Sequence, residues 1–187
     1  MCFCSTSPEQ TPVASSGPSD FRQTDVAARR TVVVMSTAAT TTFRLAPIDP
    51  ATADALRVTG DQRYVADSKP GYPCRQCLRD ADVGDELILV SHDPFTIDSP
   101  YRSSSPIFLH LEPCGAPEPA DELPVQLTGR QLSVRAFDAG AMMVDAALID
   151  GADLQATIER FFATTEAANI HVHNAVRGCW AVTIERA

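Results

Sequence analysis

Lysine is almost missing from this sequence, and basic side chains of any kind are outnumbered. Lys69 is the only lysine, and Lys and Arg together number 15 against 24 Asp and Glu, which gives a formal net charge of −9 at pH 7. A chain with this charge repels a phosphate backbone, and no run of basic residues offsets the repulsion. We therefore expect no nucleic-acid partner.

Long apolar runs are missing as well. The longest near the N-terminus is Val32–Met35, whereas a membrane-spanning helix needs about 20 apolar residues. Arg29 and Arg30 precede this run as in a twin-arginine export signal, but the residues after it are too polar for the apolar part of such a signal. We expect no membrane association and a cytoplasmic location, where thiols stay reduced.

The signature motifs of common enzymes are also lacking. The sequence contains no nucleophile elbow, no phosphate-binding Walker loop and no glycine-rich dinucleotide fingerprint. These absences disfavour a familiar enzyme class, and they leave open whether the protein is an enzyme at all. Aromatic residues make up only 6% of the chain, so aliphatic side chains must form most of the core.

The length of 187 residues suits one domain with a substantial core. Residues 1–40 are rich in Ser, Thr, Pro and Ala and show no hydrophobic periodicity, so we predict a disordered, low-complexity tail. Met35 is a candidate translation start, because sequence typical of ordered structure begins only a few residues later. Residues 41–187 are predicted to form a single globular domain, whose oligomeric state the sequence does not indicate.

Hydrophobic patterns and turn residues define the expected elements. They predict strands at 42–48, 87–90, 107–111, 131–138, 141–149, 169–173 and 179–184. Two helices are predicted, one over 50–57 with Asp49 as its N-cap and one over 153–162. The stretch 59–80 has no sustained period and is predicted to be a loop. Strands joined mostly by hairpins, with two short helices, indicate an α+β fold with a mostly antiparallel sheet.

Cysteine and histidine residues gather at three places, with the spacings Cys74-x₂-Cys77, His110-x₃-Cys114 and His171-x-His173-x₅-Cys179. In a hairpin that turns about Val176, His173 lies opposite Cys179 and His171 shares the same face of the strand. Zinc accepts mixed Cys and His ligands, and a Cys-x₂-Cys loop directs two sulfurs to one metal. One interpretation is therefore a site for zinc or another transition metal, with candidate ligands Cys74, Cys77, Cys114, His171 and Cys179, although the sequence makes no cofactor certain.

Two other interpretations fit the same cysteines. Cys74 and Cys77 could form a redox-active pair, although the strand and helix that normally flank such a pair are missing. The simpler interpretation is that the cysteines are small side chains buried in the core, as free cysteines usually are. Only the first pair has a standard zinc spacing, so the sequence leaves all three interpretations open.

Arginines in loops that contain Pro and Gly form a second candidate site. Arg75, Arg79 and Arg102, with Tyr101 beside the last, are predicted to line a pocket for a small anionic ligand. The alternative is that these arginines form salt bridges with Asp80, Asp82 or Asp93.

Three stretches carry a family likeness: Pro73–Ala81, Ser99–His110 and Ile170–Cys179. From Phe43 to the C-terminus the chain resembles a bacterial family known only as domain of unknown function 1203. The family has no assigned activity, and the resemblance implies that His173 is a poor candidate for an essential ligand, because many relatives have arginine there. We expect a small binding or accessory module for an anionic ligand. The alternative is a metal- or thiol-dependent enzyme that uses the Cys-x₂-Cys loop with nearby His and Cys.

Overall fold

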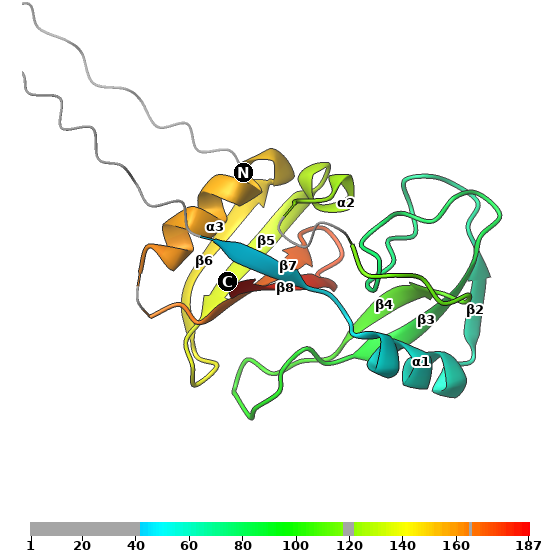
Figure 1. Cartoon of the computed structure of the whole chain (residues 1–187), viewed down its shortest axis with the longest axis horizontal. Coiled ribbons are helices and arrows are strands. Elements are labelled where there is room, and N and C mark those ends of the chain that lie inside the picture. The colour runs from blue at the N-terminus through cyan, green and yellow to red at the C-terminus, as the bar shows by residue number, and fades with distance from the viewer. Residues whose placement is uncertain (1–41, 118–121, 165) are drawn as a thin grey trace, which may run out of the picture. The chain divides into compact units, whose positions relative to one another are not determined.

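The computed structural model describes residues 42–117, 122–164 and 166–187. The predicted tail, residues 1–40, and the candidate start Met35 lie outside these ranges. Two antiparallel sheets lie side by side, and helices pack on them (Figure 1). The predicted fold class, a single α+β domain with mostly antiparallel strands, is confirmed.

The larger sheet has five strands in the order β1-β8-β7-β5-β6, and every neighbouring pair is antiparallel. Its strands are β1 (Phe43–Ala46), β5 (Gln131–Phe137), β6 (Met143–Asp150), β7 (Asn169–Asn174) and β8 (Trp180–Arg186). Along β5, Leu132, Val134 and Ala136 are buried, whereas Ser133 and Arg135 between them are half-buried. This alternation is the period-two pattern from which the strand was predicted.

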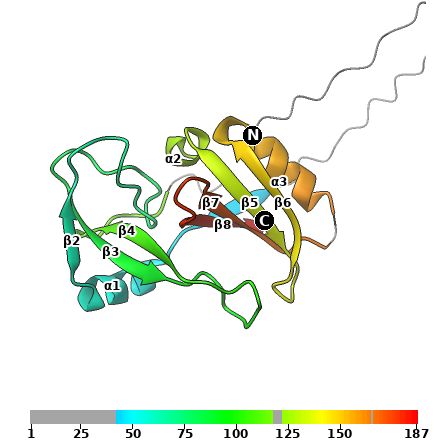
Figure 2. The ribbon, with the colours of Figure 1, turned by 180° about the vertical axis from the view of Figure 1, so that it is seen from behind.

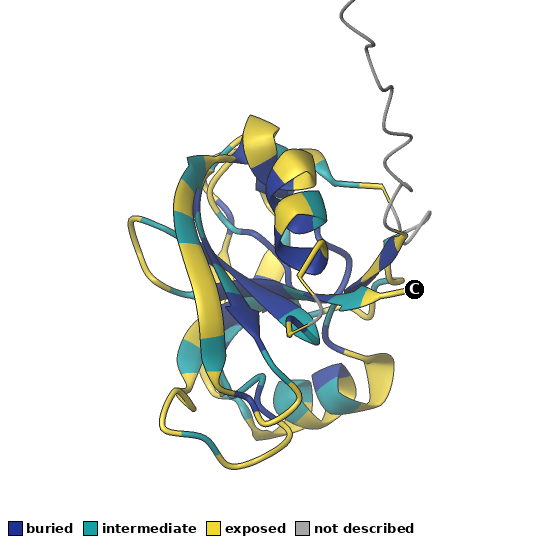
Figure 3. Ribbon diagram, turned by 90° about the vertical axis from the view of Figure 1, so that its left-hand side faces the viewer, coloured by how far each residue is buried: buried dark blue, intermediate teal, exposed yellow. Residues whose placement is uncertain are grey.

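One face of the larger sheet is covered by α3 (Leu154–Phe162), which follows the 3₁₀ turn η1 (Gly151–Asp153). Leu154, Ile158 and Phe161 recur at helical spacing and are buried in one cluster with the strand residues. Figure 3 shows the buried side of this helix facing the sheet and its exposed side facing outward. Each such side chain stabilises the fold by roughly 1.5–3 kcal/mol. The predicted second helix is confirmed.

The smaller sheet has the order β2-β3-β4, formed by β2 (Gln62–Val65), β3 (Glu86–His92) and β4 (Ser105–His110). Seen from behind, α1 (Pro50–Thr59) runs beside it (Figure 2). The helix begins as predicted, because the Asp49 carboxylate accepts a hydrogen bond from the backbone N–H of Thr52 at 3.0 Å. Within the described ranges, no helix is long and apolar enough to cross a membrane.

The two sheets meet where β8 passes β4. The backbone N–H of Trp180 donates to Ser105 Oγ at 3.1 Å. The Trp180 side chain is buried in a cluster with Ile88 and Ile107 of the smaller sheet. An indole from one sheet therefore fills part of the core of the other.

Three details differ from the sequence predictions. The stretch 59–80 contains β2, whose residues are all exposed, so no apolar alternation marks it. The one-turn helix α2 (Val125–Thr128) was not predicted. In the terminal hairpin, His173 pairs with Trp180 and not with Cys179, because the strands slip by one residue between Val172 and His173. The turn itself closes through Gly178, whose φ of 73° is left-handed.

Gly151 is the first residue of the 3₁₀ turn η1, and a substitution there tests how tightly the turn into α3 is packed. An added Cβ would lie 2.2 Å from the carbonyl oxygen of Leu127 and 2.7 Å from that of Arg130. These atoms belong to the backbone and cannot rotate away, so we expect Gly151→Ala to lower the free energy of unfolding by about 2 kcal/mol or more. Chemical denaturation measures this. Gly115→Ala is the matched control, because nothing lies within 4 Å of its added Cβ. Equal stabilities for the two variants would contradict the prediction.

Candidate metal centre

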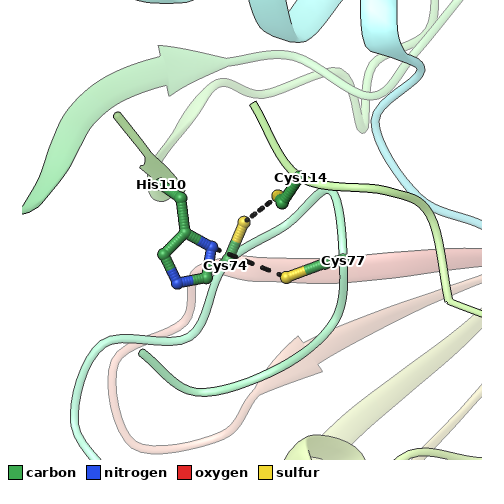
Figure 4. Close-up of side chains that lie close together, drawn as sticks. All are labelled: Cys74, Cys77, His110 and Cys114. Atoms are coloured by element: carbon green, nitrogen blue, oxygen red, sulfur yellow. Dashed lines mark hydrogen bonds between the residues drawn. The ribbon is translucent and has the colours of Figure 1, made fainter. Parts of the chain in front are cut away.

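Four side chains from three segments converge at one end of the smaller sheet (Figure 4). Cys74 and Cys77 come from the loop between β2 and β3, His110 ends β4, and Cys114 follows four residues later. One ligand atom from each residue lies within 4.8 Å of all the others. We refer to these four residues as the Cys₃His cluster, and their geometry could hold a metal ion.

Two of the separations between ligand atoms match the edges of a tetrahedral site. Cys74 Sγ lies 3.7 Å from Cys114 Sγ, and Cys77 Sγ lies 3.6 Å from His110 Nδ1. With metal distances of about 2.3 Å to sulfur and 2.0–2.1 Å to nitrogen, a tetrahedron has edges of about 3.8 Å between two sulfurs and about 3.6 Å between sulfur and nitrogen. The cysteines are free thiols, since a disulfide requires sulfurs about 2.05 Å apart.

A tight backbone turn aims the first two sulfurs at the same point. The N–H of Cys74 donates to the carbonyl of Arg79 at 3.0 Å, and Leu78 between them takes a left-handed φ of 52°. The turn is held from outside as well, because the Arg57 guanidinium of α1 donates to Gln76 Oε1 at 2.5 Å and to the carbonyl of His110 at 2.8 Å. One arginine thus fixes the loop relative to the end of β4.

The cluster favours negative charge on one sulfur, that of Cys74. Hydrogen bonds from Cys114 and then Cys77 lower the pKa of Cys74. Hydrogen bonds to Cys74 and then Cys77 raise the pKa of His110 to about 10, and the same neighbours raise the pKa of the Cys114 thiol. At these distances the sulfurs and the imidazole share protons. A metal cation would displace those protons, because Cys and His bind metals in their deprotonated forms.

Charged residues around the cluster fit a metal site too. His110 Nε2 lies 3.6 Å from Asp85 Oδ2, on the far side of the ring from Nδ1. A carboxylate in this position fixes the tautomer in which Nδ1 is free to bind a metal. Arg79 lies beside the sulfurs, and its hydrogen bond to Cys77 followed by the charge of that thiol raises the pKa of its guanidinium.

The structure divides the five predicted metal ligands. Cys74, Cys77 and Cys114 meet in the cluster, whereas His171 and Cys179 are not part of it. The fourth member is His110, which was left out of the predicted ligand set although its spacing from Cys114 was noted. That His-x₃-Cys spacing at the end of a strand was the available signal.

The two residues left out contact other groups. His171 is buried between Phe95 and Phe137, with ring centroids 4.7 and 4.8 Å away. Cys179 is half-buried, and its sulfur accepts hydrogen bonds from Arg75 at 3.4 Å and Asn174 at 3.5 Å.

The predicted anion-binding residues are placed at separate points. Arg75 is buried and donates to the carbonyls of Trp180 and Pro73, both at 2.6 Å. Arg79 lies beside the Cys₃His cluster. Arg102 pairs with Asp93 at 2.6 Å, as the salt-bridge alternative predicted, and the Tyr101 ring lies 6.0 Å from that of Phe137. Arg75 and Arg79 line two different hollows of the described surface, and Tyr101 and Arg102 line neither.

The fold and the cluster together define a small α+β domain with a four-residue Cys₃His centre on a Cys-x₂-Cys loop. The chain belongs to the family described as protein of unknown function (DUF1203), whose model matches residues 71–186. The matched range includes all four cluster residues, and the resemblance inferred from the sequence is confirmed. No curated protein and no solved structure matches the chain.

The buried histidines of β7 predict how stability changes with pH. Burial lowers the pKa of His171 and of His173 to about 4, below the unfolded value of about 6.5. The unfolded chain therefore binds more protons between these values, so stability is retained above pH 6.5 and falls as the pH drops toward 4. The loss should reach roughly 3 kcal/mol for each histidine.

Urea denaturation of the parent and of His171→Gln between pH 7 and pH 4 measures this dependence. The variant should lose less stability on acidification than the parent, because one of the two protons is no longer taken up. Parallel pH profiles for the two proteins would show that His171 does not contribute.

Proposed function

We propose that the Cys₃His cluster binds one zinc ion and that the protein is a zinc-stabilised binding or accessory module. The observation that carries this proposal is the convergence of four donors within 4.8 Å of one another. Two of their separations, 3.7 Å between two sulfurs and 3.6 Å between sulfur and nitrogen, match the edges of a tetrahedral zinc site. Sites with four protein ligands are typically structural, since no coordination position is left for a substrate.

Zinc fits the donor set better than a hard cation does. Thiolates and imidazole are the ligands that zinc prefers, whereas calcium and magnesium require oxygen. Three thiolates and one Zn²⁺ leave a net charge of −1, which the neighbouring Arg79 guanidinium would offset. A reducing compartment such as the cytoplasm suits the site, because it keeps closely spaced thiols available to a metal.

A metal at the cluster would join two segments that have little regular structure of their own. In the loop from Ala66 to Asp85, β-type pairing is limited to two isolated bridges, Pro73 with Asp80 and Cys74 with Phe108 of β4. Cys114 lies in a second irregular segment. A zinc ion would tie both segments to the end of β4 through His110, and so replace the packing that regular structure would otherwise supply.

A metal- or thiol-dependent enzyme is the second candidate. A hollow of about 510 Å³ beside the cluster is lined by Arg79, Asp85 and His110, among others. A catalytic metal would need to exchange one protein ligand for substrate at this hollow. The burial of Cys74 and Cys77 favours the structural role.

Elemental analysis of protein purified without chelator tests the zinc site. We expect about one zinc ion per chain, and its loss in Cys77→Ser and His110→Gln, because three ligands hold zinc far more weakly than four. Cys179→Ser and His171→Gln are matched controls that should retain the metal. Substoichiometric metal in the parent protein, or retention in Cys77→Ser, would overturn the proposal.

Removal of the metal should also destabilise the fold. We expect a strong chelator to lower the melting temperature of the parent by about 10 °C or more, since the binding energy of a structural zinc is folding energy. Differential scanning calorimetry with and without chelator measures the shift. Cys77→Ser should already melt at the lower temperature and should not respond to chelator. A parent whose melting temperature is unchanged by chelator would not need a structural metal.

A further inference from the structure

A groove of about 1040 Å³ is lined by Pro73 and Arg75 of the Cys-x₂-Cys loop and by neither of the loop's two cysteines. One wall comes from the smaller sheet and the loop, and includes Tyr64, Tyr72 and Phe108. The other wall comes from the start of β5 and the turn between β7 and β8, and includes Arg130, Asn174 and Arg177. Segments distant in the sequence thus form one concave surface, as ligand sites commonly do.

The charge of this groove is opposite to that of the protein. The described residues that line it include Arg75, Arg130 and Arg177 and no Asp or Glu, although the chain carries a formal charge of −9. Asp80, which does not line the groove, pairs with Arg130 at 2.5 Å. Two guanidinium charges, those of Arg75 and Arg177, have no carboxylate partner among the described residues.

Arg75 is the more unusual of the two. Its side chain is 1% exposed, and its hydrogen-bond partners are two carbonyl oxygens and the Cys179 sulfur. Burial without a counter-charge destabilises a cation, and it lowers the pKa of this guanidinium. An anion in the groove would supply the missing charge without displacing the hydrogen bonds that hold Arg75 in place.

Aromatic rings form the facing wall. Tyr64 and Tyr72 each meet Phe108 edge to face, with ring centroids 5.5 and 5.2 Å apart. Tyr64 remains 39% exposed. Edges and faces of partly exposed rings are good contacts for another flat ring.

We propose that this groove binds a small organic anion that carries a flat ring beside its charged group, with the ring on Tyr64, Tyr72 and Phe108 and the anion toward Arg177 and Arg75. This assigns the anionic ligand to a different residue set from the one the sequence suggested, with Arg75 shared. The assignment does not require zinc to contact the ligand. Because Arg75 belongs to the loop that the proposed zinc would hold, the zinc content of each protein is measured alongside binding.

Cys179 offers a probe for the charge of the groove. Its half-buried thiol lines the groove beside Arg75. Iodoacetate is an anion, and iodoacetamide is its neutral analogue. Peptide mass spectrometry gives the rate at which each reagent alkylates Cys179. The iodoacetate rate divided by the iodoacetamide rate, normalised to the same ratio for N-acetylcysteine, reports the electrostatic potential at the thiol. We expect this normalised ratio to be about three or more, and to fall toward one as salt is added.

Substitutions test whether the groove arginines produce this electrostatic potential. Arg177→Gln should lower the normalised ratio. Because Arg177 is exposed, the fold should tolerate the substitution. Arg63→Gln is the matched control, because Arg63 is an exposed arginine of β2 that does not line the groove. A normalised ratio of one or less in the parent, or equal effects of the two substitutions, would overturn the proposal.

Thermal shift and calorimetry then test the ligand. Two anionic probes, indole-3-acetate and adenosine monophosphate, are compared with their neutral analogues, indole-3-acetamide and adenosine. Binding of at least one anion, with a Kd about fivefold or more weaker in Arg177→Gln and in zinc-replete Arg75→Gln, supports the proposal. The probe that binds distinguishes a carboxylate from a phosphate ligand. If neither anion binds more tightly than its neutral analogue, the groove is not an anion site, whether or not zinc is present.

Discussion

The fold depends on the anchoring of one residue, Arg75, between the two sheets. Its backbone N–H donates to Phe108 in β4, and its carbonyl accepts from Ile48 before α1. Its guanidinium donates to the carbonyl of Trp180 in β8. A single buried residue therefore connects the smaller sheet, the start of α1 and the larger sheet. Removal of its side chain would leave the Trp180 and Pro73 carbonyls buried without donors, which costs about 1–3 kcal/mol for each group.

This anchoring explains why two different chemistries lie so close together. In the sequence Cys-Arg-Gln-Cys, the turn directs both sulfurs to the cluster with His110 and Cys114, whereas the arginine between them extends toward Trp180 and the groove. A metal that fixed the turn would also fix the guanidinium. Cluster and groove would then be coupled through the rigidity of a short loop, without any conformational change.

The sequence predicted the elements that have a strong periodic signal and missed those that do not. The alternation in β5 and the apolar stripe of α3 reflect burial on one face, so both could be predicted from residue spacing. β2 has no buried face, and one slipped residue beside His173 cannot be derived from alternation. At the candidate site, the Cys74-x₂-Cys77 pair was found because its two members are neighbours in the chain. Its pairing with His110 and Cys114 depends on the contact between the loop and β4, which no local pattern encodes.

The contacts around the cluster also distinguish the three interpretations of the cysteines. Buried cysteines that serve only as small apolar side chains would be surrounded by aliphatic groups, as Cys74 and Cys77 partly are in the core of the smaller sheet. That interpretation gives no reason for a histidine nitrogen 3.6 Å from one sulfur, with a carboxylate on the far side of its ring. A redox pair accounts for two thiols and leaves Cys114, whose sulfur lies 3.7 Å from that of Cys74, without a role. A metal site accounts for all four groups and for the Asp85 carboxylate, because each is a ligand or orients one.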